Sequence, residues 1–130
     1  MDAKILEKVT KDPYANFLGI TVDEVKEGYA KVSMNITGDM LNIHNTVNGG
    51  VIFSLADVAF AIASNTYEQT AVGINVNMNF IAAGFTGDKL IAIAEEVSKN
   101  PKLGFYRMEV RNESAQLLAT AEGMVYRKKK

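Results

Sequence analysis

The chain has 130 residues, enough to bury one hydrophobic core but too few for two ordinary domains, so we expect a single domain over residues 1–130. Apolar residues make up 48% of the chain and the formal net charge is -1, which excludes a general attraction to nucleic acid or to acidic membranes. The chain contains no cysteine, and this excludes disulfides, thiolate nucleophiles and zinc–cysteine sites.

The N-terminal segment mixes charged residues among its apolar ones and lacks the continuous apolar stretch of a signal peptide, so we expect a cytoplasmic protein. Ile5, Leu6 and Val9 share one helical face, which predicts an edge helix. Pro13 is expected to stop this helix before a short turn over residues 14–18.

Two strands are predicted next, over residues 20–25 and 29–36, in a hairpin around Gly28. The second strand alternates apolar and polar side chains, which predicts one dry face. Residues 40–48 are polar, irregular and rich in asparagine, a composition typical of a functional loop.

Residues 51–63 form the longest apolar stretch of the chain, interrupted by Ser54 and Asp57. The stretch falls short of the ~20 residues needed to cross a bilayer, so no membrane span is expected. Because it is apolar on nearly every side, it predicts a helix wrapped by other structure. We therefore expect the Asp57 carboxylate to be at least partly buried, where it must be paired, remain protonated or serve in catalysis.

After this helix, residues 71–82 alternate apolar side chains with asparagines, which predicts a strand with one apolar and one amide-rich face. Three further antiparallel strands are predicted over residues 89–97, 103–111 and 116–126. The order contains no alternating βαβ units, so the predicted class is α+β. Since one sheet covers only one side of a buried helix, we expect at least a homodimer, in which a second subunit covers the rest.

Gly49 and Gly50 lie at the start of the predicted helix, where backbone N–H groups have no intrahelical acceptor and the helix dipole is positive. Without Cβ atoms, these residues let a substrate carbonyl approach the amides as in an oxyanion hole. For the glycines alone, a tight turn into the helix is the better interpretation, and Asp57 shifts the balance toward catalysis. Asp57 lies ~10 Å along the axis from Gly50, so a substrate would have to bridge two subunits.

A narrow stripe of polar or small residues runs down the predicted helix at spacings of three and four, through Ser54, Asp57, Ala61 and Asn65. The alternative to a catalytic Asp57 is an aspartate bonded to a neighbouring strand, because buried polar groups must be paired.

The segment from Met40 to Gly50, followed by residues 53–61 (FSLADVAFA), resembles the hot-dog-fold acyl-CoA thioesterases, in particular the phenylacetyl-CoA thioesterase (PaaI-like) branch. Residues 79–81 and 84–88 also match in character. The resemblance covers nearly the whole chain. It implies a hot-dog fold, with a long central helix wrapped by a curved antiparallel sheet, in a homodimer or homotetramer that hydrolyses acyl-CoA without a metal or another cofactor.

The resemblance also implies roles for single residues. Asp57 matches the catalytic carboxylate, a nucleophile or general base, and Gly50 or Gly49 matches the glycine whose N–H polarises the thioester carbonyl. Asn42 matches an asparagine that helps to position water or the carboxylate. Asn75 falls where some relatives place a serine or threonine near the reacting centre.

This chain departs from the family pattern in the loop before the helix. Asn48 stands where the family usually has a histidine, and Ile43 replaces a usual glycine. Asparagine can donate a hydrogen bond or orient the loop, but it cannot carry a proton at neutral pH. His44 is a candidate substitute, although a lone loop histidine is more often merely solvated.

The predicted catalytic and substrate-binding residues are Asp57, Gly50, Gly49, Asn42 and Asn48, together with Phe53, Ser54, Asn75 and Phe80. Phe60 and Tyr67 are further candidates for the pocket wall, and equally for the core. The predicted reaction is hydrolysis of a small or aromatic acyl-CoA. Two alternatives remain open: an acyl-CoA binding or sensing protein that has lost turnover through Asn48, and a hydratase or dehydratase on the same fold.

Overall fold

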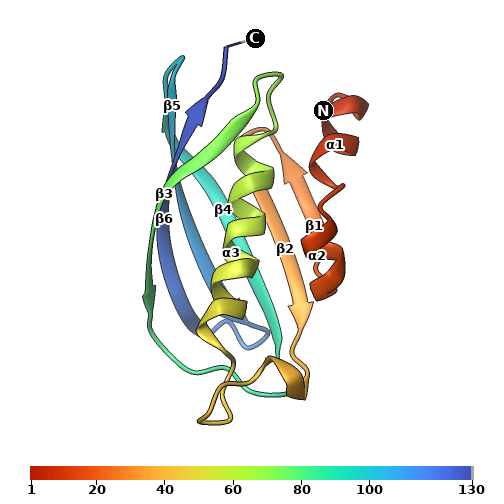
Figure 1. Cartoon of the computed structure of the whole chain (residues 1–130), viewed down its shortest axis with the longest axis vertical. Helices are drawn as coiled ribbons and strands as arrows, with labels where there is room; N and C mark the ends of the chain where they lie inside the picture. The colour runs from red at the N-terminus through yellow and green to blue at the C-terminus, as the bar shows by residue number, and fades with distance from the viewer. Residues whose placement is uncertain (130) are drawn as a thin grey trace.

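One long helix lies against a curved six-stranded antiparallel sheet (Figure 1). The structure is a computed structural model that describes residues 1–129. Its elements, in chain order, are α1 (Ala3–Val9), α2 (Pro13–Leu18), β1 (Thr21–Lys26), β2 (Tyr29–Asn35), the 3-10 helix η1 (Gly38–Met40), α3 (Gly49–Ser64), β3 (Ala71–Phe80), β4 (Lys89–Lys99), β5 (Leu103–Asn112) and β6 (Leu117–Arg127). The predicted α+β class, with a central helix wrapped by the sheet, is confirmed.

The strands lie side by side in the order β1-β2-β4-β5-β6-β3, and every neighbouring pair is antiparallel. The predicted hairpin and its dry face are confirmed, since Ala30, Val32 and Met34 of β2 are buried. The chain leaves β2, forms the loop and α3, and then returns to the opposite edge as β3. This path places β1 and β3 at the two edges of the sheet.

The buried side of α3 packs against the sheet through closely spaced small and large apolar residues. Five of them are at most 2% exposed: Leu55, Ala56, Ala59, Phe60 and Ala63. The Phe60 ring lies edge-on to Tyr106, with centroids 5.7 Å apart, and rests on Gly123 of β6. A Cβ atom on Gly123 would come within 2.7 Å of the ring, so this close approach requires glycine. Phe60 is therefore a core residue and not a pocket wall.

The segment after α1 differs from the prediction. Pro13 does not end a helix; it occupies the first turn of a second short helix, α2, and α1 has already ended at Val9. The Asp12 carboxylate caps α2 by accepting hydrogen bonds from the N–H groups of Tyr14 at 3.0 Å and Ala15 at 3.1 Å. Proline suits this position because its missing N–H and fixed φ cost nothing in the first turn.

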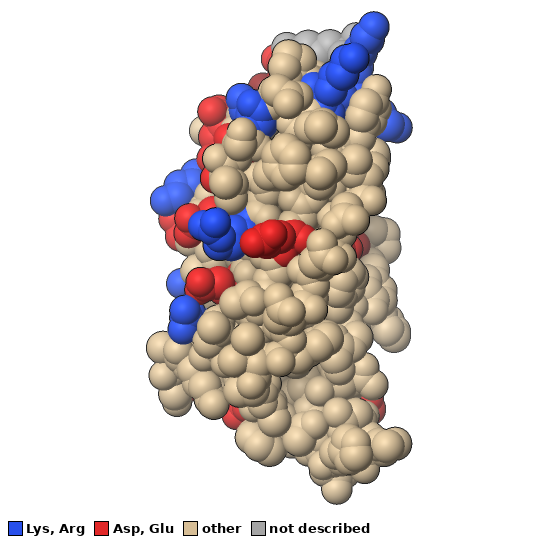
Figure 2. All heavy atoms as spheres, turned by 90° about the vertical axis from the view of Figure 1, so that its left-hand side faces the viewer, with Lys and Arg blue, Asp and Glu red and all other residues tan. Residues whose placement is uncertain are grey.

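The edge strand β3 is largely exposed on both faces in the single chain. Val72, Ile74 and Phe80 are 39%, 54% and 58% exposed, whereas Val76 and Met78 are partly buried against the core, so the predicted apolar face is only partly covered within the described chain. The strand contains no charged residue. On the side of the molecule that carries this edge, the lower half is almost without charged side chains (Figure 2). No helix among the described residues is long and apolar enough to cross a membrane.

Candidate active site

The loop before α3 is ordered by one asparagine side chain. Asn42 Oδ1 accepts hydrogen bonds from the backbone N–H groups of His44 at 2.8 Å and Thr46 at 3.2 Å, and Asn42 Nδ2 donates to Thr46 Oγ1 at 3.0 Å. The Asn48 N–H donates to the carbonyl of Met40 at 2.9 Å, which fixes the end of the loop. The loop therefore presents the first residues of α3 in one defined orientation.

Asn48 is the N-cap of α3. Its Oδ1 accepts the Gly50 N–H at 2.7 Å, so one of the two predicted oxyanion donors is already occupied. The Gly49 N–H has no acceptor among the described residues. It lies at the positive end of a 16-residue helix. Of the two glycine amides, the one at Gly49 is the group free to receive a substrate oxygen.

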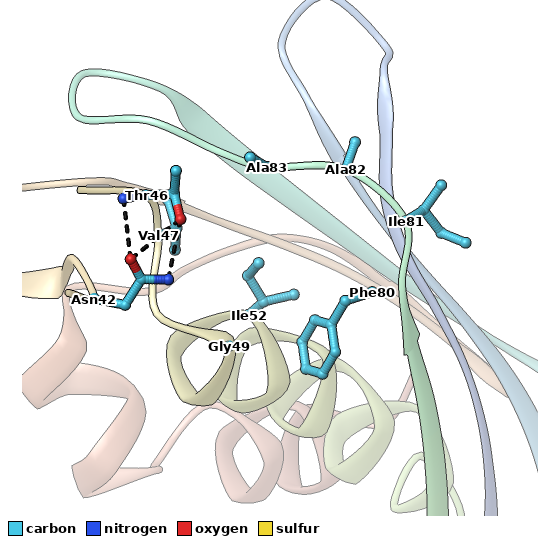
Figure 3. Close-up of a pocket in the computed structure, with 9 residues that line it drawn as sticks. All are labelled: Asn42, Thr46, Val47, Gly49, Ile52, Phe80, Ile81, Ala82 and Ala83. Carbon is cyan, nitrogen blue, oxygen red and sulfur yellow. Dashed lines mark hydrogen bonds between the residues drawn. The ribbon is translucent and has the colours of Figure 1, made fainter. Parts of the chain in front are cut away.

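A cavity of about 360 Å³ opens in front of Gly49 (Figure 3). Its lining combines the amide of Asn42 and the hydroxyl of Thr46 with the apolar side chains of Ile52 and Phe80. The Phe80 ring lies directly over Gly49, where a Cβ atom would come within 3.2 Å of it. Glycine at this position thus leaves both the ring and the amide accessible to a ligand.

Asp57 lies on the exposed side of α3, where the surrounding protein still partly desolvates its carboxylate, as the expected partial burial requires. The sheet covers only the opposite side of the helix, so a stripe of α3 through Gly50, Phe53, Asp57 and Ala61 faces solvent. The Asp57 carboxylate has no hydrogen bond or ion pair within residues 1–129. Even so, desolvation by the surrounding protein raises its pKa above the ordinary value, and the negative charge of Asp12 raises it further.

Helix α2 contacts this stripe one turn before Asp57. The Tyr14 hydroxyl lies 3.0 Å from Ser54 Oγ, and Ser54 Oγ donates to the Gly50 carbonyl at 2.8 Å. Tyr14 and Asp12 were missed by the sequence reasoning, because the segment was expected to be a turn. The signal that could have found them is Asp12-Pro13, a typical helix start.

The remaining predicted residues lie in different surroundings. Asn75 is exposed on β3, and its Oδ1 accepts a hydrogen bond from Asn77 Nδ2 at 3.0 Å. His44 is exposed in the loop. Tyr67 donates its hydroxyl hydrogen to Glu96 at 2.9 Å and lies outside both the cavity at Gly49 and the Asp57 stripe. The single chain therefore brings Asn42, Gly49 and Phe80 together, and it separates them from Asp57.

The described residues contain no group of three or more histidine, aspartate or glutamate side chains that could hold a metal ion.

The curved sheet around one long helix, and the two glycines with which that helix begins, define the class: this is a hot-dog-fold protein. The family model of the thioesterase superfamily matches residues 44–119, which include the second half of the loop and all of α3. The chain belongs to the thioesterase superfamily.

Two relatives cover most of the chain. A putative esterase of Archaeoglobus fulgidus is 42% identical over 96% of this chain and 84% of its own length. The acyl-coenzyme A thioesterase PaaI of Escherichia coli is 38% identical over 89% of this chain and 83% of its own length.

A solved structure also matches this chain closely along most of its length. The Escherichia coli PaaI protein from the phenylacetic acid degradation operon superposes with a TM-score of 0.92 at 35% identity, covering 95% of this chain and 90% of that one. The resemblance to the PaaI-like thioesterases is thereby confirmed.

Proposed function

We propose that this protein hydrolyses coenzyme A thioesters of small or aromatic acids. The observation that carries the proposal is the unpaired Gly49 N–H at the positive end of α3, open to a cavity. Membership of the thioesterase superfamily supports it, and so does the likeness to a relative named acyl-coenzyme A thioesterase. The part of the cavity that surrounds the amide is lined by Phe80 and Ile52, which suits an uncharged acyl thioester.

The site requires two subunits. Gly49 and Asp57 are eight residues apart on one helix, about 12 Å along its axis, which is too far for both to act on one carbonyl. The exposed stripe of α3 and the uncharged edge strand β3 are surfaces that a second copy would cover. A homodimer, alone or within a homotetramer, would place Asp57 of one subunit opposite Gly49 of the other.

In this arrangement the Gly49 N–H donates to the thioester oxygen and stabilises the negative charge that forms on it. As a general base, Asp57 takes a proton from water while the water oxygen adds to the carbonyl carbon. The C–S bond then breaks, and the thiolate of coenzyme A leaves and takes up a proton. As a nucleophile, Asp57 would instead form a mixed anhydride that water hydrolyses.

The second candidate function is binding of acyl-CoA without turnover. The observation in its favour is Asn48, whose Oδ1 is occupied in capping α3 and whose side chain cannot carry a proton at neutral pH. A hydratase is less well supported, since the only histidine, His44, is exposed in the loop and not on the helix.

The test is release of free coenzyme A from a panel of acyl-CoA thioesters of increasing length, with aromatic members and crotonyl-CoA included. We expect hydrolysis of part of the panel and no hydration of crotonyl-CoA. Measurable binding without turnover would identify a sensing protein, and hydration would identify the hydratase.

The two-subunit site has its own test, in which Asp57→Asn and Gly49→Pro chains are co-expressed in equal amounts. Proline suits the backbone of the first helical turn and removes the N–H, and its ring also occupies the space next to Phe80. Each variant alone should be inactive, whereas about a quarter of the sites in the mixture would be intact if the dimers form at random. No recovery of activity in verified mixed dimers would show that the site lies within one chain.

A further inference from the structure

Helix α2 is fastened to the exposed face of α3 by a chain of two hydrogen bonds. A serine hydroxyl has one hydrogen, and that of Ser54 goes to the Gly50 carbonyl at 2.8 Å. Tyr14 must therefore be the donor in its 3.0 Å contact with Ser54 Oγ. Tyr14 thus donates to Ser54, and Ser54 donates to the Gly50 carbonyl in the first turn of α3. The same turn carries the free Gly49 N–H.

The same helical turn of α2 holds a carboxylate. Asp12 accepts hydrogen bonds from the N–H groups of Tyr14 and Ala15, so its position is fixed relative to the Tyr14 backbone. The charge of Asp12 reaches Asp57, and Asp57 is the only charged residue of α3. The Tyr14 hydroxyl that contacts α3 and the Asp12 carboxylate therefore belong to the same short helical segment.

We propose that Tyr14 is a positioning residue for Asp57: its hydrogen bond to Ser54 holds α2, and with it the Asp12 carboxylate, against the catalytic face of α3. This inference rests on the proposed role of Asp57. It gives α2 a task in the reaction, since a carboxylate held partly away from water and beside a like charge is a stronger base than a free one.

The other charged groups near this face belong to α1 and the link to α2. Lys8, Lys11 and Asp12 line a cavity of about 380 Å³ between the N-terminal segment and α3. Lys11 is paired with Glu7 at 2.8 Å, and Lys8 donates to the carbonyl of Tyr67 at 3.2 Å. Both cations are thus engaged by other partners, whereas the charge of Asp12 acts on Asp57.

The first experiment follows the titration of the Asp57 carboxyl by NMR in Tyr14→Phe. Removal of the hydroxyl frees α2, so the pKa of Asp57 should fall toward its ordinary value because both desolvation and the charge of Asp12 weaken. The matched control is Tyr126→Phe, since Tyr126 is also exposed and its hydroxyl has no partner within residues 1–129. An Asp57 pKa unchanged in folded Tyr14→Phe overturns the proposal.

The second experiment is a double-mutant cycle with Asp12→Asn, which keeps the helix cap but removes the charge. Tyr14→Phe should lower the pKa of Asp57 by less in this background than in the wild type, because the contribution of Asp12 is already gone. Equal effects in both backgrounds would show that Tyr14 does not act through Asp12. Ser54→Ala, which removes the acceptor, should reproduce the effect of Tyr14→Phe.

The kinetic readout is the acidic limb of kcat/KM on a hydrolysed thioester. In Tyr14→Phe this limb should move to lower pH, with a plateau about three- to ten-fold lower as expected for a weaker base, while Tyr126→Phe matches the wild type. A lowered melting temperature with an unmoved limb would indicate a purely structural contact and overturn the proposal. The NMR titration needs no turnover, so failure of the proposed hydrolysis and failure of the positioning role are distinguished.

Discussion

Two carboxylates of this protein lie in opposite surroundings. Glu96, on β4, accepts the hydroxyl hydrogens of Tyr67 at 2.9 Å and Tyr106 at 3.1 Å on a single oxygen. Asp57, on α3, has no hydrogen bond or ion pair in the described chain and is exposed. The first carboxylate is bound into the fold, and the second is left open to a ligand.

The difference separates a structural acid from the one that we propose to be reactive. Glu96 joins the segment after α3 to strands β4 and β5, and burial together with the neighbouring Glu96 raises the pKa of both tyrosine hydroxyls, so they remain donors. Nothing comparable satisfies Asp57. A group that is held at the surface of a packed helix without a partner contributes little to folding, and this is what a catalytic group requires.

Asp57→Asn should give the largest effect on activity. We expect hydrolysis to fall ~100-fold or more, the scale for loss of a general base or nucleophile, with fold and oligomeric state unchanged. The melting temperature should stay the same or rise, because no hydrogen bond is lost and an ionised group at a partly desolvated position is removed.

Steady-state kinetics and thermal unfolding of the same preparation check this prediction. Wild-type activity in Asp57→Asn would remove Asp57 from the mechanism. A large drop in the melting temperature would instead place Asp57 with Glu96 as a structural acid.

Glu96→Ala should lower stability and leave activity nearly unchanged. It leaves the hydroxyl of Tyr106, a residue only 2% exposed, without its acceptor, and the free energy of unfolding should fall by about 1 to 3 kcal/mol. Activity per folded molecule should stay near that of the wild type, because Glu96 lies outside the cavity at Gly49 and the Asp57 stripe.

Chemical denaturation measures this loss, and Glu96→Gln is the matched control. Glutamine keeps an oxygen that can accept from Tyr67 and Tyr106, so its loss should be smaller. Equal losses in the two variants would mean that the charge, and not the acceptor, is what the fold uses.

Much of this fold follows from local patterns in the sequence. The apolar run of α3 and the alternation in β2 predicted a wrapped helix and a half-buried strand, and both are confirmed. Helix α2 was missed because Pro13 was assigned to a helix end and not to a helix start. The exposure of β3 was also missed, since alternation shows which side chains share a face but not whether anything covers it.

The site was predicted less completely, for two physical reasons. The motif identified Gly49, Gly50 and Asp57, but the sequence did not show that Asn48 occupies the Gly50 N–H and leaves that of Gly49 free. The outcome depends on which backbone N–H the Oδ1 atom of the cap side chain accepts. The sequence also did not show that Asp57 lies on the side of α3 that the sheet leaves uncovered, because an apolar run does not reveal which stripe of a helix is left for a partner.

Substitutions at Asn48 should produce a smaller effect that separates capping from chemistry. Asn48→Ala removes the acceptor of the Gly50 N–H, and the free energy of unfolding should fall by about 1 kcal/mol, as for other N-caps. Asn48→Asp keeps the cap but removes the side-chain donor and adds a negative charge near the oxyanion, so stability should hold while turnover falls. Asn48→His should preserve or raise turnover.

Denaturation and turnover of the three variants check these expectations. Kinetics that are unchanged in all three would place Asn48 outside the reaction and leave it only as a helix cap. If the wild type merely binds acyl-CoA, Asn48→His is the variant expected to gain hydrolysis.

The smallest expected effect is the pH dependence of stability caused by Asp57. Its pKa in the folded protein is raised above the ordinary value of 3.8, so the folded state binds the proton more tightly than the unfolded state. The stability that protonated Asp57 contributes is present below pH 3.8 and is lost as the pH rises through the raised folded pKa. The melting temperatures of wild type and Asp57→Asn should therefore be most similar in acid. Toward neutral pH, the melting temperature of the variant should become the higher of the two. In an Asp12→Asn background the divergence should be smaller, because one of the two causes of the raised pKa has been removed. A higher melting temperature for the wild type than for the variant at neutral pH would show that ionised Asp57 has a stabilising partner in the assembled protein. Asp57 would then be a structural acid, as Glu96 is.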